Sequence, residues 1–397
     1  MLKPTIISIS MATVMAGAAI SPALGLIAKA FPDADPVIIK LILTAPSLMI
    51  IPFSFLASFL TSKIRKRTIV LTGLLIYLIG GVGAQFVNSI EAMLAFRLLL
   101  GVGVGLVMPL SMSLISDYFS GKERAKMMGY NAAFSNFGGI VTMMFAGFLA
   151  GYGWRVPFNV YFMGLVIMVL VYFFLPKDKV QKAKSDGPKQ KIALPVYGYA
   201  LAMGGVMLAY YSIATNMALY LEQSHLGGAG LAGSVISFTT VGGMITSLLL
   251  VRLQEVFKKF IIPIMLFSMG IAFTILSFTH AVPLIIVSVC LVGFGQGVLF
   301  PLLTLKAMDY VAPHQSDRAV AITSSCTFIG QFLSPIVLDS MGKLFHTSSI
   351  RFQYGVLAAC LLLIFTTILF FMFNRSRSTA MSNKTSTGNA TDNQPVG

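Results

Sequence analysis

Charged residues are scarce in this chain, and their scarcity excludes a water-soluble fold. Only 10% of the 397 residues are charged, and only 13 residues are acidic. Soluble domains are about one quarter charged, so this composition is not that of a protein folded in water. Cysteine (3 residues) and histidine (4 residues) are also rare. All three cysteines lie inside predicted membrane spans, so we expect neither a disulfide framework nor a metal cluster.

Long apolar runs are abundant instead, and 56% of all residues are hydrophobic. Runs of about 18 or more apolar residues can cross roughly 30 Å of hydrocarbon as helices, which satisfy their backbone hydrogen bonds internally. The sequence therefore predicts an all-α integral membrane protein with twelve transmembrane helices. The predicted spans are residues 5–28, 38–62, 68–87, 91–114, 124–151, 155–175, 193–221, 229–251, 260–279, 282–308, 318–342 and 348–373.

Basic residues are concentrated in alternate loops between these spans. The formal net charge is +15, and basic clusters follow the second, fourth, sixth and eighth spans, at residues 63–67, 122–126, 177–191 and 252–259. This asymmetry is the positive-inside bias, so we predict that the protein lies in the cell membrane with both termini in the cytoplasm. The placement favours the lipid bilayer as the partner and argues against nucleic acid.

A motif in the first half of the chain recurs 192 residues later in the second half. Each copy has three glycines at every second position, followed by a proline and then by an aspartate. The two copies lie in the fourth and tenth spans, so each half has six helices of the same orientation. Parallel halves related by a pseudo-two-fold axis along the membrane normal occur in secondary transporters. We predict an N-terminal half (1–175), a basic cytoplasmic linker (176–192), a C-terminal half (193–373) and a disordered cytoplasmic tail (374–397).

The six repeated glycines favour close helix packing. A dinucleotide-binding fingerprint would need a preceding strand and a different spacing. Here the glycines follow apolar helical runs, and small residues let helices in a membrane approach closely. The glycines assigned to packing are Gly101, Gly103, Gly105, Gly293, Gly295 and Gly297.

Three short motifs resemble those of one transporter family. Arg97 precedes the glycines of the fourth span, and Gly-Trp-Arg-Val-Pro at 153–157 leads into the sixth span. The third motif is the basic loop after the second span, with Ser58, Lys63, Lys66 and Arg67. Together they resemble the major facilitator superfamily, most of all its drug:proton antiporters. The loop keeps the family's basic positions but lacks its two glycines and its aspartate, which by resemblance helps to hold the halves together.

Polar side chains are confined to some of the spans. The sixth, ninth and twelfth spans have almost none, and by resemblance these helices and the third support the outside while the others line a central cavity. The predicted substrate-cavity residues are Asn131, Ser135, Asn136, Tyr210, Tyr211, Asn216, Gln296, Ser325 and Gln331. The alternative is that such side chains only bond neighbouring helices.

Two charged residues are candidates for coupling or gating. Arg97 lies about two turns inside the fourth span, where a charge costs at least about 2.5 kcal/mol. The matched motif implies a coupling role for it, and the alternative is that its side chain reaches the outer surface. Asp339, near the outer end of the eleventh span, is the candidate proton carrier, and the alternative is a surface charge.

The predicted function is secondary active transport of a small molecule by alternating access. The first hypothesis is proton-coupled efflux of hydrophobic or amphipathic compounds, because 23 Met and 31 Phe residues permit an adaptable apolar cavity. The alternative is uptake or exchange of a specific small organic anion or nutrient, with Arg97 facing it. The sequence has no motif for ATP binding or intramembrane catalysis, so we expect no enzymatic activity and no cofactor. We expect protons to be the coupling ion. We also expect the protein to be a monomer.

Overall fold

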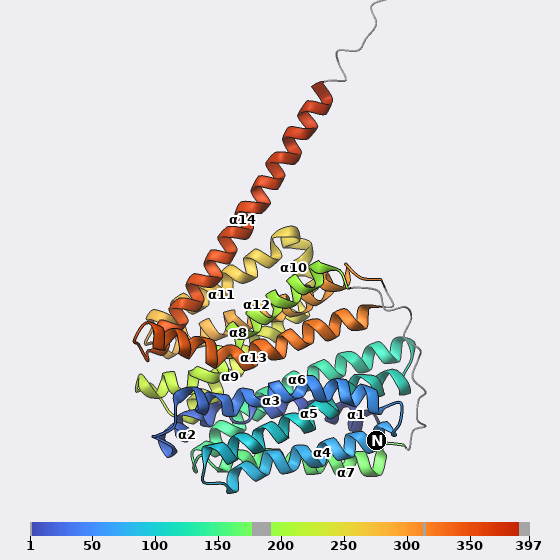
Figure 1. Cartoon of the computed structure of the whole chain (residues 1–397), viewed down its shortest axis with the longest axis vertical. Coiled ribbons are helices and arrows are strands. Elements are labelled where there is room, and N and C mark those ends of the chain that lie inside the picture. The colour runs from blue at the N-terminus through green and yellow to red at the C-terminus, as the bar shows by residue number, and fades with distance from the viewer. Residues whose placement is uncertain (1, 177–191, 313–314, 389–397) are drawn as a thin grey trace, which may run out of the picture.

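The computed structural model describes residues 2–176, 192–312 and 315–388, and the predicted linker at 177–191 lies outside this part. All regular elements of the described residues are helices (Figure 1). In chain order they are α1 (Leu2–Ala18), η1 (Ser21–Ala23), α2 (Leu24–Ala30), α3 (Pro36–Leu60), α4 (Lys66–Gly83), η2 (Ala84–Phe86), α5 (Ile90–Tyr118), α6 (Gly121–Ala150), η3 (Val156–Phe162), α7 (Met163–Phe174), α8 (Leu194–Gln223), α9 (Ala229–Leu248), α10 (Leu250–Phe257), η4 (Lys258–Phe260), α11 (Ile261–Phe278), α12 (Val282–Met308), α13 (Ser316–Leu344) and α14 (Ile350–Gly388).

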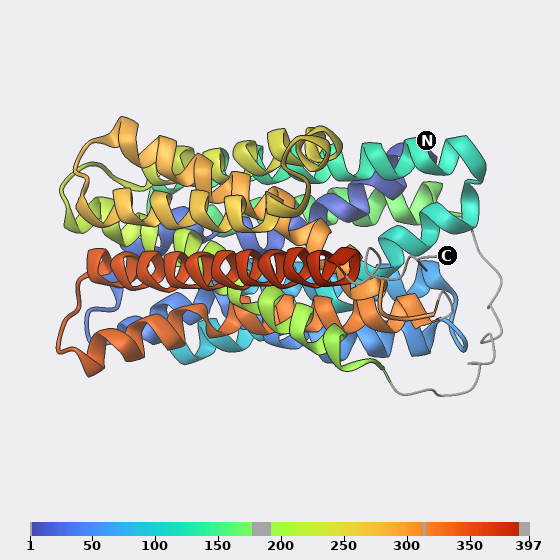
Figure 2. The ribbon, with the colours of Figure 1, turned by 90° about the horizontal axis from the view of Figure 1, so that it is seen from above.

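Twelve helical segments in the described part are long and apolar enough to cross a membrane, which confirms the predicted number. They lie side by side and roughly parallel (Figure 2). Local signals fix where they start. In α3, for example, Pro36 occupies the first turn, and the Asp35 carboxylate accepts a hydrogen bond from the Val37 amide at 2.9 Å. Such a cap satisfies an amide that the first turn of a helix leaves unpaired.

Two spans are divided in ways that the hydropathy pattern does not reveal. The first span consists of α1, η1 and α2, because Pro22 cannot donate a helical hydrogen bond and interrupts the helix. The eighth span, predicted to end at residue 251, ends at Leu248 and is followed by the separate α10. None of the described residues of α10 is buried. Its exposure is typical of a helix that lies along a membrane surface.

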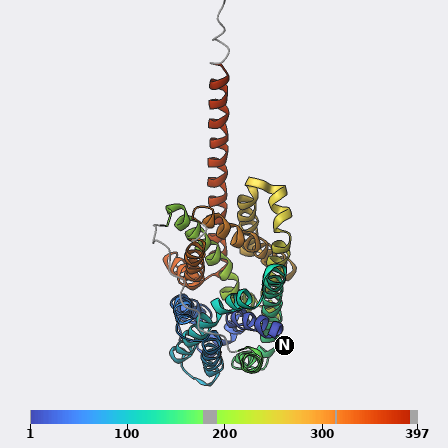
Figure 3. The ribbon, with the colours of Figure 1, turned by 90° about the vertical axis from the view of Figure 1, so that its right-hand side faces the viewer.

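The first six spans and the last six form two groups of helices (Figure 3). The repeated glycines have the same surroundings in both groups. A Cβ atom on Gly101 in α5 would lie 2.4 Å from the Pro46 oxygen in α3, and one on Gly293 in α12 would lie 2.0 Å from the Thr239 oxygen in α9. The other four repeated glycines would also place a Cβ atom 2.8 Å or less from a neighbouring helix. The backbones of these helices can approach so closely only because no side chain separates them.

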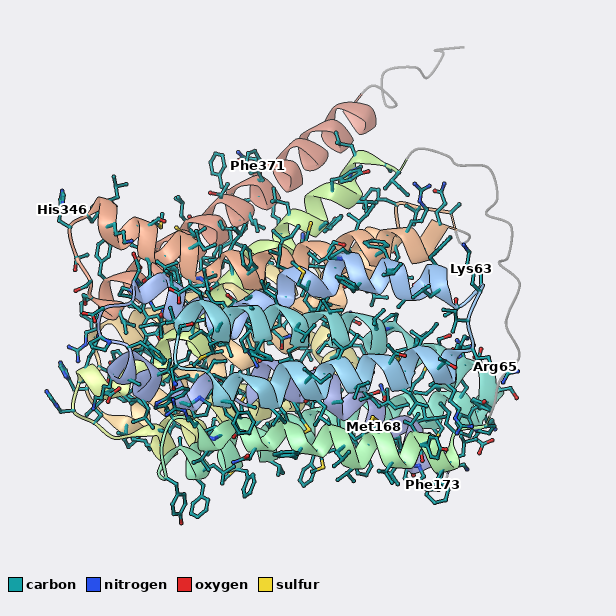
Figure 4. The ribbon with its side chains drawn as sticks, turned by 60° about the horizontal axis from the view of Figure 1, so that its bottom comes forward. Lys63, Arg65, Met168, Phe173, His346 and Phe371 are labelled. Atoms are coloured by element: carbon teal, nitrogen blue, oxygen red, sulfur yellow. The ribbon has the colours of Figure 1, made fainter. Side chains whose placement is uncertain are left out.

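The two ends of the bundle carry different loops. Lys63 and Arg65 lie at one end and His346 lies at the other (Figure 4). We call these the basic end and the opposite end. Since the helices alternate in direction, the chain enters α8 and leaves α12 at the basic end and enters α14 at the opposite end.

The last helix differs from its prediction. The sequence predicts a span ending at residue 373 and a disordered tail, whereas α14 continues as a helix to Gly388. It projects well beyond the other helices (Figure 1), and Phe371 already lies outside the bundle (Figure 4). A helix satisfies its backbone hydrogen bonds internally, so it can extend without a packing partner. Residues 389–397 of the predicted tail lie outside the described part.

Candidate functional site

A cavity of about 520 Å³ lies between the two halves, about midway along the helices that line it. Its walls come from α1, α6, α8, α9 and α12. Four predicted substrate-cavity residues line it, namely Asn136, Tyr210, Tyr211 and Gln296. None of its described lining residues is charged. The cavity therefore offers hydroxyl and amide groups to a ligand, together with apolar side chains such as Met143, Met244 and Phe300.

The two tyrosines of the cavity approach different neighbours. A Cβ atom on Gly17 in α1 would lie 2.9 Å from the Tyr211 hydroxyl oxygen, so this hydroxyl lies directly against the N-terminal half. Tyr210 forms a hydrogen bond with Thr240 in α9, and both residues line the cavity. Tyr211 therefore lies at the interface between the halves, and Tyr210 joins two helices of the C-terminal half.

The other five predicted cavity residues do not line this cavity. Three of them bond a neighbouring helix, as the alternative interpretation predicts: Asn131 with Ser10, Asn216 with Gln353 at 3.0 Å, and Gln331 with Ser47 at 3.0 Å. Ser325 donates to the carbonyl oxygen of Ala321 in its own helix at 2.8 Å, and Ser135 is half-buried. The sequence identifies polar positions within spans, but the face of the helix decides what they contact.

A buried ion pair joins the halves towards the opposite end. Lys40 Nζ in α3 lies 2.6 Å from Asp339 Oδ1 in α13. Gln353 of α14 donates to the same oxygen at 2.6 Å and in turn accepts a hydrogen bond from Asn216 of α8. Three helices thus meet at one carboxylate, and α8 joins them through Gln353.

Burial distinguishes this pair from an ordinary surface contact. Lys40 is 3% exposed and Asp339 is 8% exposed, so the interpretation of Asp339 as a surface charge is wrong. Asp339 Oδ2 has no hydrogen-bond partner among the described residues. The pair also borders a hollow of about 490 Å³ at the opposite end. Lys40, which was not predicted as a site residue, lies inside α3, and its only signal in the sequence is a lysine within an apolar run.

Two further ion pairs join the halves at the opposite end, nearer its surface. Lys343 Nζ lies 2.7 Å from Asp35 Oδ2, and Lys29 pairs with Glu222. The hydrogen bond from Lys343 and the Val37 amide together lower the pKa of the Asp35 carboxyl below its usual value. With the buried pair, these contacts close the opposite end across the interface between the halves.

Arg97 is completely buried and donates three hydrogen bonds to groups of the N-terminal half. Its Nε donates to the Ile42 oxygen at 2.7 Å, and its terminal nitrogens donate to the Tyr161 hydroxyl at 2.6 Å and the Ala16 oxygen at 3.1 Å. The Arg97 side chain has 0% exposure, so the interpretation that it reaches the outer surface is wrong. It is not among the cavity-lining residues. Because Ala16 precedes the lining residue Gly17, Arg97 supports the cavity wall from behind.

The basic loop motif contacts helices of the N-terminal half. Lys66 is buried and donates to Asp117 and Ser113 in α5, each at 2.6 Å. Arg67 donates to the Tyr172 oxygen in α7, and the Lys63 ammonium lies 4.6 Å from the centre of the Phe59 ring. Ser58 donates to the oxygen of the preceding turn in α3. These contacts fix α3, α4, α5 and α7 together at the basic end.

Comparison with known proteins decides the family. The sequence profile of the Major Facilitator Superfamily matches residues 6–335 and 199–391. The chain belongs to this superfamily of transporters. No group of three histidine, cysteine, aspartate or glutamate residues in the described part could hold a metal ion.

Individual relatives of this superfamily member are distant. The chain is 24% identical over 319 residues to the uncharacterized MFS-type transporter YcnB of Bacillus subtilis, covering 80% of this chain but only 60% of YcnB. It is 22% identical over 328 residues to the quinolone resistance protein NorA of Staphylococcus aureus, covering 77% of this chain and 81% of NorA. Its fold resembles an inward-facing bacterial homologue of the human lysosomal transporter Spinster, with a TM-score of 0.72, 16% identity and coverage of 94% and 96%.

Proposed function

We propose that this superfamily member exports hydrophobic or amphipathic compounds through the central cavity in exchange for protons. The observation that carries the proposal is the cavity between the halves, whose described lining is uncharged and combines apolar and aromatic side chains with a few hydroxyl and amide groups. Such a lining selects by size and apolar area rather than by charge. The similarity to NorA, named for quinolone resistance, supports the same substrate class.

The ion pairs at the opposite end support a transporter that opens by relative movement of its halves. Lys40 and Asp339, like Asp35 and Lys343, belong to different halves, so the pairs must separate before this end can open. We place the basic end in the cytoplasm, because basic loops are retained on that side. Under this proposal the protein lies in the cell membrane with both termini in the cytoplasm, and the end closed by the ion pairs faces the outside.

Asp339 is the proposed coupling residue. Its carboxylate holds the Lys40 ammonium at 2.6 Å and also receives the Gln353 amide. A proton on Asp339 would remove the charge that compensates Lys40, which is costly in a buried site and favours opening towards water. Proton binding and opening of the outer end are thereby linked through one group. The alternative, uptake of a small anion facing Arg97, lacks support because Arg97 binds groups of its own half.

Inverted membrane vesicles containing the protein test this function. Under an imposed pH gradient, we expect movement of a lipophilic dye such as ethidium into vesicles with the wild-type chain and not into vesicles with Asp339→Asn. Asp33→Asn removes an exposed carboxylate at the same end and should keep wild-type transport. If the wild-type chain moves no dye at normal expression, or Asp339→Asn transports as well as the wild type, the proposal is wrong.

A further inference from the structure

A second hollow lies in the C-terminal half, away from the central cavity. It has a volume of about 970 Å³ and is bounded by α8, α11, α12, α13 and α14. We call it the lateral groove. It exists because α14 packs mainly against α11 and diverges from the other helices (Figure 1). The lateral groove is therefore open towards the surrounding lipid.

The wall that α8 contributes to the lateral groove contains a row of small residues. Gly198, Ala202, Gly205 and Ala209 recur at helical spacing along it. A Cβ atom on Gly198 or Gly205 would meet no atom within 4 Å, so the space in front of them is open. Leucine, isoleucine, valine and methionine side chains make up most of the remaining wall.

Polarity is confined to the basic end of the lateral groove. Lys259 is the one charged residue among its described lining residues. Tyr199 and Tyr310 lie at the same end, with their ring centres 5.8 Å apart. Tyrosines of this kind mark the level of lipid head groups. The groove thus has a positive, hydrogen-bonding end and an apolar remainder, which is the polarity that complements a negatively charged lipid.

The length of the lateral groove favours an acyl chain over a compact ligand. Its lining extends along α8 from Pro195 to Ala209, which corresponds to roughly 21 Å at 1.5 Å per residue. The hydrocarbon of one leaflet is about 15 Å thick, half of the usual 30 Å. An occupant anchored at Lys259 can therefore extend through the whole leaflet within the groove.

We propose that the lateral groove binds an anionic phospholipid of the cytoplasmic leaflet. The phosphate lies at Lys259, and one acyl chain extends between α8 and α14. Basic pockets between transmembrane helices on the cytoplasmic side recognise such head groups. Lys258 and Lys306 add positive charge at the same end, and outnumber Asp309, which adjoins Tyr310. This binding site is separate from the central cavity and does not depend on the proposed export function.

Native mass spectrometry of the purified full chain, with dioleoyl phosphatidylglycerol or dioleoyl phosphatidylcholine added, tests this site. We expect about a fivefold preference for phosphatidylglycerol at one site per chain, since one lysine near a lipid head group has about that effect. Lys259→Gln should abolish the preference, whereas Arg252→Gln, a matched exposed charge of α10 that does not line the groove, should keep it. Gly205→Leu should fill the groove and remove bound lipid of both kinds.

Two further measurements locate the bound lipid. Gly129→Leu, at a helical glycine that also faces open space but lies outside the groove, should retain phosphatidylglycerol. Cys360 lines the groove, so in a chain with Cys290→Ala and Cys326→Ala its alkylation should slow when phosphatidylglycerol is present. Equal binding of both lipids by the wild type, or phosphatidylglycerol binding unchanged in Lys259→Gln and Gly205→Leu, would show ordinary contact with bulk lipid and overturn the proposal.

Discussion

The buried pair of Lys40 and Asp339 allows the cost of closing the opposite end to be estimated. Asp339→Asn keeps the side-chain volume and an acceptor for Gln353, but leaves the Lys40 ammonium buried without its compensating charge. Removing one partner of a buried ion pair costs about 3–5 kcal/mol. Opening this end lets water hydrate the Lys40 ammonium, so the substitution destabilises the closed state and not the open one. Because 1.4 kcal/mol is a factor of ten, we expect the ratio of closed to open molecules to fall by more than about a hundredfold.

Cross-linking across the interface measures this ratio. Lys343 Nζ and Asp35 Oδ2 lie 2.7 Å apart, so cysteines at these two positions should be joined by a short bifunctional maleimide when the opposite end is closed. The parent chain has its three native cysteines replaced by alanine. Losing the exposed Asp35–Lys343 pair costs at most about 1 kcal/mol, which is small beside the expected effect. We expect rapid cross-linking in the parent and in the control Asp33→Asn, and at least about tenfold slower cross-linking in Asp339→Asn.

The double variant Lys40→Met/Asp339→Asn separates charge from packing. It removes both charges, and replacing a buried ion pair by uncharged residues is often neutral. We therefore expect cross-linking close to the parental rate. The reasoning is refuted if Asp339→Asn cross-links as fast as the parent, or if the double variant stays as slow as the single one.

Three other predictions concern packing, pH and the buried arginine. Gly101→Ala should lower the unfolding temperature in detergent, because its Cβ atom would lie 2.4 Å from a backbone oxygen of α3 and overpacking costs about 1–3 kcal/mol. Gly129→Ala, facing open space, should not lower it, and equal effects would contradict the packing account. The lowered pKa of Asp35 means that its pair with Lys343 is complete above the ordinary carboxyl pKa near about 4 and is lost only as the pH falls through the lowered value. Carbodiimide modification of Asp35 should accordingly shift to higher pH in Lys343→Gln, and an unchanged profile would count against the pair. Arg97→Met should destabilise the fold by several kcal/mol, since the buried Ile42 oxygen and Tyr161 hydroxyl lose the donor Arg97 at about 1–3 kcal/mol each, while the Ala16 oxygen keeps the Tyr161 hydroxyl as a donor. Lost transport with an unchanged unfolding temperature would instead favour a coupling role for Arg97.

The architecture was predictable from the sequence because a bilayer leaves few structural choices. A backbone in lipid must satisfy its own hydrogen bonds, so long apolar runs indicate helices and their number follows from hydropathy. The repeat around Gly101 and Gly293 indicated two similar halves, and both glycines do contact neighbouring backbones. Helix ends were less predictable, because α10 and the extension of α14 to Gly388 depend on where the chain meets the membrane surface.

The candidate site was only partly predictable, because it depends on contacts between distant residues. Asp339 was identified as a candidate, but its partner Lys40 is 299 residues away and no local pattern connects them. Tyr210 and Tyr211 line the cavity as expected, whereas Asn216 points to Gln353 of α14 instead. Spacing along one helix indicates a face, but not which other helix covers it.

Substrate-driven proton movement in proteoliposomes tests the central claim most directly. The purified chain is reconstituted with a pH indicator inside, no pH gradient is imposed, and a gradient of ethidium is applied. The account predicts proton flow opposite to the flow of ethidium in the wild type, and none in Asp339→Asn. Proton flow in the same direction as ethidium, or ethidium transport without proton movement, would contradict it.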